Sequence, residues 1–171
     1  MRPRRLSGFD YLGFRHYSLT MCTFRRQLVF VDRCVVSTMC DIFCAEATAH
    51  GFVIPAYCFM PDHVHLVVSG REENADLVRF ARRSRQRGGY VLRGRTEGPL
   101  WQDGYYEHIL RDHEPLARTI RYIAQNPVRA GLVEDWEQHP FTGSQLGPLI
   151  HVLEWLDQHG APDEDALLGL S

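Results

Sequence analysis

Apolar residues recur along this chain with two different spacings, which predict an alternation of strands and helices. Residues 16–23 alternate between polar and apolar side chains, as a half-buried strand does. Between residues 35 and 47 the apolar positions follow helical spacing instead. Residues 52–60 and 63–68 then predict two strands joined by a turn at Pro61-Asp62.

The second half of the chain continues the pattern. A basic helix is predicted over residues 75–87, a fourth strand over 105–110, a further helix from about 112 to 126 and a short amphipathic helix near 149–156. The order β-α-β-β-α-β predicts an α+β, ferredoxin- or RRM-like fold: a four-stranded antiparallel sheet with helices on one face, plus a C-terminal helix. We expect the open face of the sheet to meet a nucleic acid.

The length of 171 residues predicts a single folded domain with short additions. We expect an N-terminal arm over residues 1–15, the domain over 16–140, and a C-terminal extension over 141–171 with a short helix and an acidic tail. No apolar run approaches the ~18 residues that a membrane span needs, and no signal region follows the N-terminus. We therefore expect a cytoplasmic protein without a membrane partner.

Charge and cysteine content narrow the function further. The net charge is −2, but all 19 basic residues are arginine. Five cysteines without a Cys-x-x-Cys pair indicate a reducing compartment and exclude a disulfide scaffold. The predicted helix over 75–87 carries arginines at i, i+4 spacing, which repel each other unless an anion lies between them. A solvated helix is the alternative, but we predict phosphate contacts from Arg79, Arg82, Arg83, Arg85 and Arg87.

Two histidines separated by one residue, His63 and His65, stand at the start of a predicted strand. Because strand side chains repeat with period two, both imidazoles point to one face, about 7 Å apart along the strand. This spacing suits a single metal ion. For an isolated His-x-His, two histidines on a wet strand face are the simpler alternative.

Further along, Arg118, Tyr122 and Asn126 succeed each other at i, i+4 and i+8 along one line of a predicted helix. Pro127 disfavours helical geometry at the residue before it, so Asn126 is expected at the frayed C-terminal end of this helix. Gln125, the neighbouring alternative to Asn126, points about 100° away around the helix and so lies off the line of Tyr122. A tyrosine on an amphipathic helix is otherwise a common interfacial core residue.

The sequence words Met-Pro-Asp-His-Val-His-Leu at residues 60–66 and Tyr-Ile-Ala-Gln-Asn-Pro-Val-Arg-Ala-Gly-Leu-Val at residues 122–133 resemble a known family. They are similar to the IS200-like single-tyrosine (Y1) HUH transposases, and most closely to their REP-associated tyrosine transposase branch. The intervening Trp-Gln-Asp-Gly-Tyr-Tyr-Glu-His at residues 101–108 resembles that branch too. The resemblance covers roughly residues 15 to 140. The wider family often has Gln where Asn126 stands, which favours the REP-associated branch.

The resemblance implies a metal-dependent endonuclease and strand transferase, that is, a transposase acting on single-stranded or hairpin DNA. It implies that Tyr122 is the nucleophile and forms a covalent 5′-phosphotyrosine, and that His63, His65 and Asn126 bind a divalent Mg²⁺ or Mn²⁺. Imidazole ligands favour Mn²⁺ over Mg²⁺. The implied partners are palindromic repeats in bacterial DNA, and we favour a monomer over a homodimer.

Other residues receive secondary roles. His108, on the predicted fourth strand, is a candidate to orient a ligand histidine from behind. Arg118, Arg121 and Arg129 near the tyrosine are further candidates for phosphate contact. Tyr105 and Tyr106 are competing nucleophiles, although a strand beside Trp101 suits packing or base stacking better.

Three other classes of function compete with this interpretation. A histidine-triad nucleotide hydrolase needs a third alternating histidine as its nucleophile, and Val67 occupies that position. A cupin-like metal site needs many more strands, and it needs a glutamate closer in sequence to His63 and His65 than Glu72 is. A domesticated, non-catalytic DNA- or RNA-binding module with the same fold remains the alternative, against which the intact His63, His65, Tyr122 and Asn126 argue.

Overall fold

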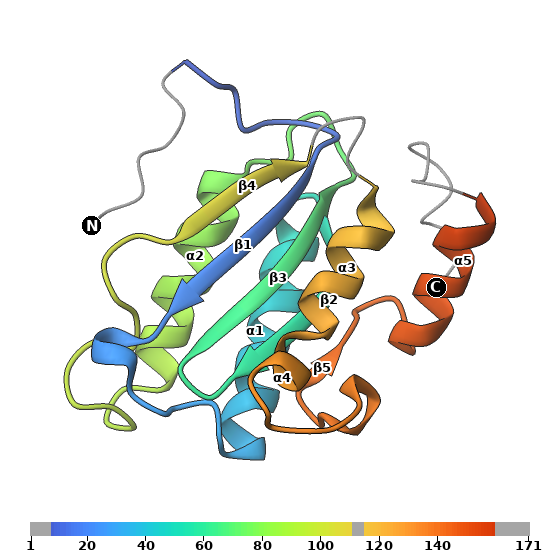
Figure 1. Ribbon diagram of the computed structural model, residues 1–171. Helices are drawn as coiled ribbons and strands as arrows, with labels where there is room; N and C mark the ends of the chain where they lie inside the picture. Colours follow the sequence, from blue (N-terminus) through green and yellow to red (C-terminus); the bar gives the residue numbers. More distant parts are fainter. Residues whose placement is uncertain (1–7, 111–114, 160–171) are drawn as a thin grey trace.

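The computed structural model describes residues 8–110 and 115–159, which fold around one antiparallel sheet (Figure 1). Within these residues the sheet has five strands in the order β4-β1-β3-β2-β5: β1 His16–Cys22, β2 Phe52–Met60, β3 His63–Gly70, β4 Tyr106–Leu110 and β5 Thr142–Gly143. The same residues form five α-helices: α1 Arg33–Ala49, α2 Leu77–Val91, α3 Leu116–Ala124, α4 Asn126–Arg129 and α5 Leu149–His159. Two 3-10 helices cover Phe24–Arg26 and Trp136–Gln138. The predicted βαββαβ order is confirmed.

The sheet differs from the predicted one in having a fifth strand. Thr142 and Gly143 pair with Cys58 and Tyr57 at the edge of β2. Two residues are too few to leave a periodic pattern in the sequence, so this strand was not predicted. The segment from residue 141, predicted as an extension, thus contributes an edge strand and α5 to the fold.

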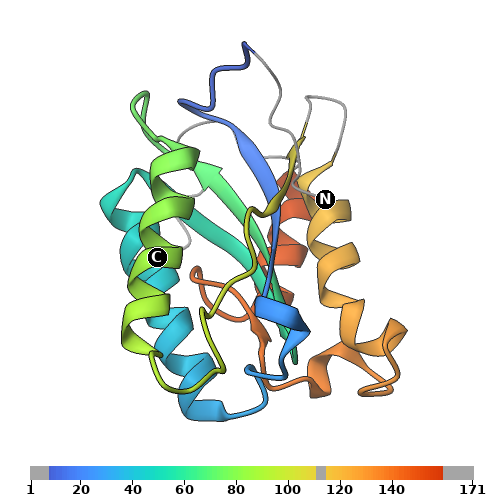
Figure 2. The same ribbon diagram turned by 90° about the vertical axis from the view of Figure 1, so that its left-hand side faces the viewer.

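Helices cover both faces of the sheet, which corrects the prediction of helices on one face. Figure 2 shows α1 and α2 on one side and α3 and α5 on the other. Alternation along β3 produces the two layers, because Val64, Leu66 and Val68 join the core under α1 and α2. Val67 points the other way and joins a second cluster under α3 and α5. The second face stays exposed toward β4, where Tyr106 is 51% accessible.

The sequence sets where the two main helices begin and how closely they approach. Asp32 accepts a hydrogen bond from the Cys34 amide and caps α1, and Asp76 caps α2 in the same way. α2 continues to Val91, beyond the predicted end at residue 87. Gly88 lies inside this helix. The position requires glycine, because a Cβ there would lie 2.6 Å from Met39 Sδ on α1. This glycine permits close helix packing instead of ending the helix.

Gly70 provides a test of the packing at the end of β3. A Cβ at Gly70 would lie 2.0 Å from the carbonyl oxygen of Gly13, and backbone cannot move aside as a flexible side chain does. We expect Gly70→Ala to lower the free energy of unfolding in urea by about 1–3 kcal/mol. Gly89→Ala is the control, because a Cβ on that helical glycine meets nothing within 4 Å. It should raise stability by about 0.5–1 kcal/mol, and equal effects of the two changes would contradict this packing.

Candidate metal and tyrosine site

The two histidines of β3 converge on one point. His63 and His65 share the sheet face on which α3 packs, with Cys22 and Thr20 of β1 as their cross-strand neighbours. Their Nε2 atoms lie 3.0 Å apart, and the ring planes are nearly perpendicular at 84°. Two ligand atoms that each lie about 2.1 Å from an ion and meet at a right angle are about 3.0 Å apart. The two Nε2 atoms therefore have the spacing of a pair of metal ligands.

Each imidazole is held from behind by its other nitrogen. His63 Nδ1 lies 2.6 Å from Asp62 Oδ1, and His65 Nδ1 lies 2.9 Å from Thr20 Oγ1. Because a carboxylate accepts, His63 carries its proton on Nδ1, and its Nε2 lone pair faces Nε2 of His65. Asp62 was expected mainly as a turn residue, and Thr20 was not predicted to take part. The polar alternation in residues 16–23 hinted at Thr20, but the strand register that places it opposite His65 is not readable from sequence.

Arg26 supports this arrangement from the end of β1. Its Nε lies 2.7 Å from Asp62 Oδ2, so the carboxylate bridges the guanidinium and His63. Arg25 and Arg26 have φ values of 54° and 57°, in the left-handed region that non-glycine residues rarely adopt. The strained turn directs Arg26 toward Asp62. Strain of this kind persists where surrounding contacts over-determine the backbone, as they do beside functional groups.

The pKa of His65 is lowered to about 3, mainly by burial and in addition by the nearby charges of His63, Arg129 and Arg26. A neutral imidazole at physiological pH is the form that coordinates a metal. The charge of Arg129 also acts on Cys58, the residue opposite His65 on β2. Arg129 therefore lies close to the two histidines, although it comes from α4.

Arg129 connects the histidine pair to the tyrosine helix. Its guanidinium lies 4.1 Å from the centre of the Tyr122 ring and donates to the Tyr122 carbonyl oxygen at 2.6 Å. It also donates to Asn126 Oδ1 at 2.8 Å, while Asn126 Nδ2 donates to the Ile123 carbonyl. The Tyr122 side chain is 63% exposed, and its hydroxyl has no hydrogen-bond partner among the described residues. The interfacial core alternative for this tyrosine does not fit such exposure.

Asn126 is not at the frayed end of the tyrosine helix, where it was expected. α3 ends at Ala124, and Asn126 opens the separate helix α4 with Pro127 in its first turn. A proline fits there because the amide nitrogens of a first helical turn have no intrahelical partner to lose. Within the described residues, no hydrogen bond joins Tyr122 or Asn126 to the histidine pair, and no third His, Cys, Asp or Glu completes a metal cluster. Asn126 Oδ1 is linked to the pair through Arg129, which donates to this oxygen and whose charge acts on His65.

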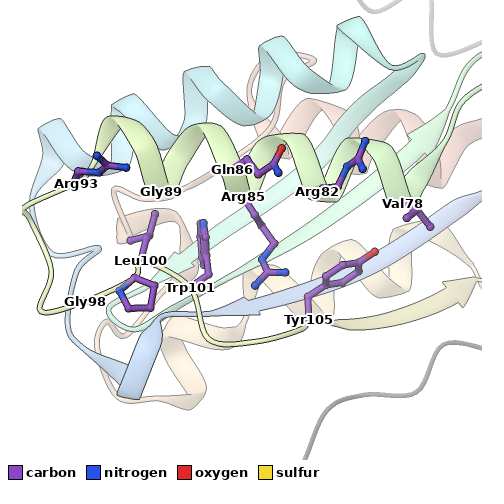
Figure 3. Close-up of a pocket in the computed structure, with 11 residues that line it drawn as sticks. Val78, Arg82, Arg85, Gln86, Gly89, Arg93, Gly98, Leu100, Trp101 and Tyr105 are labelled. Carbon is purple, nitrogen blue, oxygen red and sulfur yellow. The ribbon is translucent and has the colours of Figure 1, made fainter.

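The structure separates the other predicted residues from this site. His108 lies on β4 with β1 between it and β3, and Asp62 and Thr20 hold the positions behind the ligand nitrogens that His108 was suggested to fill. Arg121 pairs with Asp157 of α5, whereas Arg118 is exposed on α3. Helix α2 lies on the opposite face of the sheet (Figure 2), and Figure 3 shows its Arg82 and Arg85. This helix carries all five of the predicted arginines: Arg79, Arg82, Arg83, Arg85 and Arg87.

The segment that carries the histidines and Tyr122 matches a known protein family. Residues 15–126 match the family described as "Transposase IS200 like", a segment that begins just before β1 and ends at Asn126. The chain belongs to the IS200-like transposase family. The matched segment includes both histidines and Tyr122, which confirms the family to which the sequence motifs pointed.

Among the described residues, none of the helices has the length and apolar character of a membrane span.

Individual relatives of this chain include REP-associated members of the family. A putative REP-associated tyrosine transposase of Haemophilus influenzae is 31% identical over 104 residues, 53% of this chain and 59% of the relative. The REP-associated tyrosine transposase of Escherichia coli K12 is 28% identical over 91 residues, 53% of each chain. The chain thus spans little more than half the length of these relatives. A structure of a REP-associated tyrosine transposase bound to a REP hairpin has the same fold, with a TM-score of 0.69, 20% identity, and coverage of 83% of this chain and 82% of that one.

The lowered pKa of His65 predicts a pH dependence of stability. Between pH 6.5 and about 3 this imidazole is protonated in the unfolded chain but neutral in the folded chain. The free energy of unfolding therefore rises with pH in this window. One such proton contributes at most about 1.4 kcal/mol per pH unit. We expect urea unfolding in EDTA to show a shallower pH slope for His65→Gln than for wild type. His151→Gln, on the exposed side of α5, should keep the wild-type slope, and an unchanged slope for His65→Gln would exclude the neutral buried state.

Proposed function

We propose that this transposase cleaves and rejoins single-stranded or hairpin DNA through a covalent 5′-phosphotyrosine on Tyr122. The observation that carries the proposal is the convergence of His63 Nε2 and His65 Nε2 on the sheet face where α3 presents an exposed tyrosine. Membership of the IS200-like family supports the same chemistry. A non-catalytic DNA- or RNA-binding module would have no need for two imidazoles held at metal-ligand spacing.

The donor set fits a divalent ion such as Mn²⁺ or Mg²⁺. His63 and His65 would supply two nitrogens and Asn126 Oδ1 an oxygen, leaving positions for a phosphate oxygen and water. An ion held there would draw negative charge from a non-bridging phosphate oxygen while charge develops in the transition state. The carboxylate of Asp62 and the hydroxyl of Thr20 keep both rings oriented for this task.

Tyr122 would perform the bond exchange. Its phenolic oxygen attacks phosphorus, the bond from phosphorus to the 3′-oxygen breaks, and the departing 3′-oxygen gains the proton that the phenol loses. The phosphotyrosine retains the energy of the broken linkage, so a 3′-hydroxyl of another strand can reverse the step without ATP. Tyr105 is unsuited to this role because it is 6% exposed. Tyr106 shares the sheet face of the histidines but comes from the edge strand β4.

Arg129 would first hold Asn126 and then contact the DNA. In the structure its guanidinium holds Asn126 Oδ1 and lowers the pKa of His65, so a positive charge already lies where a cation would compete. With Asn126 Oδ1 taken up as a metal ligand, Arg129 would be free to contact a phosphate beside Tyr122. The relative bound to a REP hairpin supports a hairpin as the natural partner. We expect the chain to bind it as a monomer.

Covalent trapping tests the assignment of Tyr122. We expect wild type with Mn²⁺ to form a protein–DNA adduct with labelled hairpin DNA from its own genomic flanks, detected as a shifted band on a denaturing gel. Tyr122→Phe should abolish the adduct and leave hairpin binding within about twofold, because only the nucleophilic oxygen is removed. Tyr106→Phe is the matched control and should keep the adduct. An adduct that survives in Tyr122→Phe contradicts the assignment, and hairpin binding without any wild-type adduct supports the non-catalytic module.

Metal affinity tests the role of Arg129. Arg129→Gln removes a positive charge near His65 and frees Asn126 Oδ1, so Mn²⁺ titrated without DNA and followed by electron paramagnetic resonance should bind about five- to tenfold more tightly. Adduct formation should fall in the same variant. Arg118→Ala, a charge removed from an exposed position of α3, should leave Mn²⁺ affinity unchanged. Weaker Mn²⁺ binding in Arg129→Gln would instead show that the arginine supports the site.

A further inference from the structure

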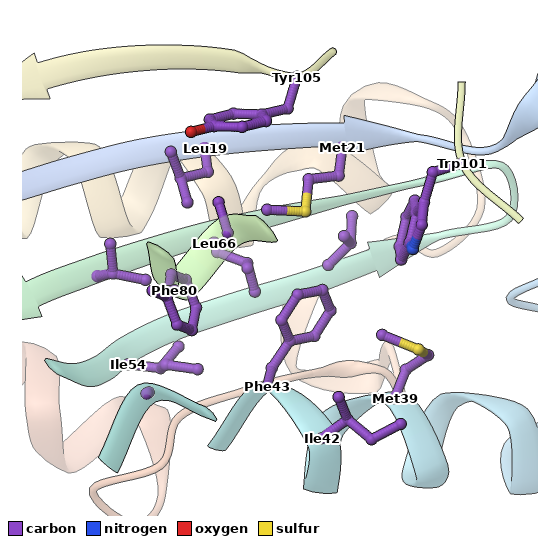
Figure 4. Packing of buried hydrophobic residues seen from close by; sticks show 14 of the residues in the cluster. Leu19, Met21, Met39, Ile42, Phe43, Ile54, Leu66, Phe80, Trp101 and Tyr105 are labelled. Carbon is purple, nitrogen blue, oxygen red and sulfur yellow. The ribbon is translucent and has the colours of Figure 1, made fainter. Parts of the chain in front are cut away.

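Two cysteines of α1, Cys40 and Cys44, stand one helical turn apart and therefore lie on the same side of the helix. Figure 4 shows Met39 and Phe43 of this helix pointing into the core, which leaves the two cysteines on its flank, where each is partly exposed. They belong neither to the histidine pair nor to the cavity of about 610 Å³ that opens beside α2, between this helix and residues 98–105 (Figure 3).

The Cys40 sulfur accepts two hydrogen bonds, one from the Cys44 thiol and one from the Tyr57 hydroxyl on β2. The bond from Cys44 and then that from Tyr57 lower the pKa of Cys40 to about 7, while burial and the charge of Asp41 oppose the shift. The bond to Cys40 raises the pKa of Cys44, and burial together with Cys40 raises that of Tyr57. Cys40 is therefore the member of this thiol cluster (Cys40, Cys44 and Tyr57) that ionises near neutral pH.

A partly exposed thiolate held by hydrogen-bond donors is the form of cysteine that peroxides attack. Cys58 shows the contrasting case, because it is fully buried and burial raises its pKa to about 11. Cys40 and Cys44 also pack against the core, but packing alone does not require a tyrosine hydroxyl directed at a sulfur. Cys34, exposed at the start of the same helix, provides an internal comparison.

Tyr57 connects the thiol cluster to the edge strand β5. It pairs with Gly143, and a Cβ at Gly143 would lie only 2.6 Å from the Tyr57 hydroxyl oxygen. The hydroxyl therefore lies directly over the backbone of this two-residue strand. Just beyond it, the Gln145 amide donates to the Ile54 carbonyl oxygen at 3.0 Å. An oxygen atom added to the Cys40 sulfur would displace the Tyr57 hydroxyl against this strand.

We propose that Cys40 is a peroxide-sensitive site, and that its oxidation to a sulfenic acid loosens β5 from the edge of the sheet. The thiolate attacks one oxygen of hydrogen peroxide, the S–O bond forms as the O–O bond breaks, and the departing hydroxide is protonated to water. Sulfur thereby loses two electrons, which peroxide gains. Cys44 does not close a disulfide, because Cβ atoms one helical turn apart are separated by about 5–6 Å and a disulfide spans about 3.5–4.5 Å. Neither the histidine pair nor Tyr122 takes part.

The pH dependence of alkylation tests the thiolate. In the reduced full chain with EDTA, the rate of iodoacetamide alkylation at each cysteine is followed by mass spectrometry from acidic to alkaline pH. We expect the rate at Cys40 to reach half its plateau near pH 7. Tyr57→Phe removes one donor and should lower the rate at Cys40 about threefold below that pH. Cys34→Ala should leave the profile of Cys40 unchanged, whereas a midpoint at about 8.5, that of an ordinary cysteine, would overturn the proposal.

Peroxide treatment tests the modification and its effect on β5. Stoichiometric hydrogen peroxide with dimedone, a trap for sulfenic acids, should label Cys40 in preference to Cys34. Without dimedone, peroxide should speed hydrogen–deuterium exchange over residues 142–146 about threefold or more in wild type. Cys40→Ser, with its thermal midpoint monitored to confirm folding, should show no such change. Preferential labelling of Cys34, a Cys40–Cys44 disulfide detected by the loss of two hydrogens, or unchanged exchange in oxidised wild type would each overturn the proposal.

Discussion

The antiparallel pairing of β1 with β3 is the constraint on which the rest of the molecule depends. Its register sets Thr20 opposite His65 and Cys22 opposite His63, so both imidazoles face α3. A shift of one residue would exchange the two faces of β3 and turn His63 and His65 into the core under α1 and α2. The shift is disfavoured because Val64, Leu66 and Val68 would then leave that core. Hydrophobic burial on one face thereby fixes the position of the polar chemistry on the other.

The end of β1 connects the histidine pair with the cavity beside α2. The amide and hydroxyl of Thr23 both donate to the Asp62 carbonyl oxygen, which anchors the turn before His63. The same residue forms a backbone bridge with Trp101, and Phe24 donates to the Leu100 carbonyl. One short segment thus positions the carboxylate behind the histidine pair and one wall of the cavity beside α2. Substitutions there are expected to disturb both surfaces together.

Much of this arrangement could be predicted from local sequence. Period two placed His63 and His65 on one face, and the motif around Tyr122 and Asn126 pointed to the family. Features that depend on tertiary contacts could not be predicted in this way. The sequence does not reveal that Asn126 begins its own helix, that Thr20 holds His65, or that the α2 arginines lie across the sheet from the tyrosine. Each depends on strand register or helix placement, which long-range packing decides.

The central claim is that His63, His65 and Asn126 bind one divalent ion beside Tyr122. Anomalous X-ray diffraction from crystals of the Tyr122→Phe protein grown with Mn²⁺ and hairpin DNA tests it most directly. We expect a single manganese peak in contact with Nε2 of both histidines and Oδ1 of Asn126, with Arg129 turned away from that oxygen. A manganese peak that lacks either imidazole, or Asn126 still held by Arg129 beside a bound ion, would contradict it.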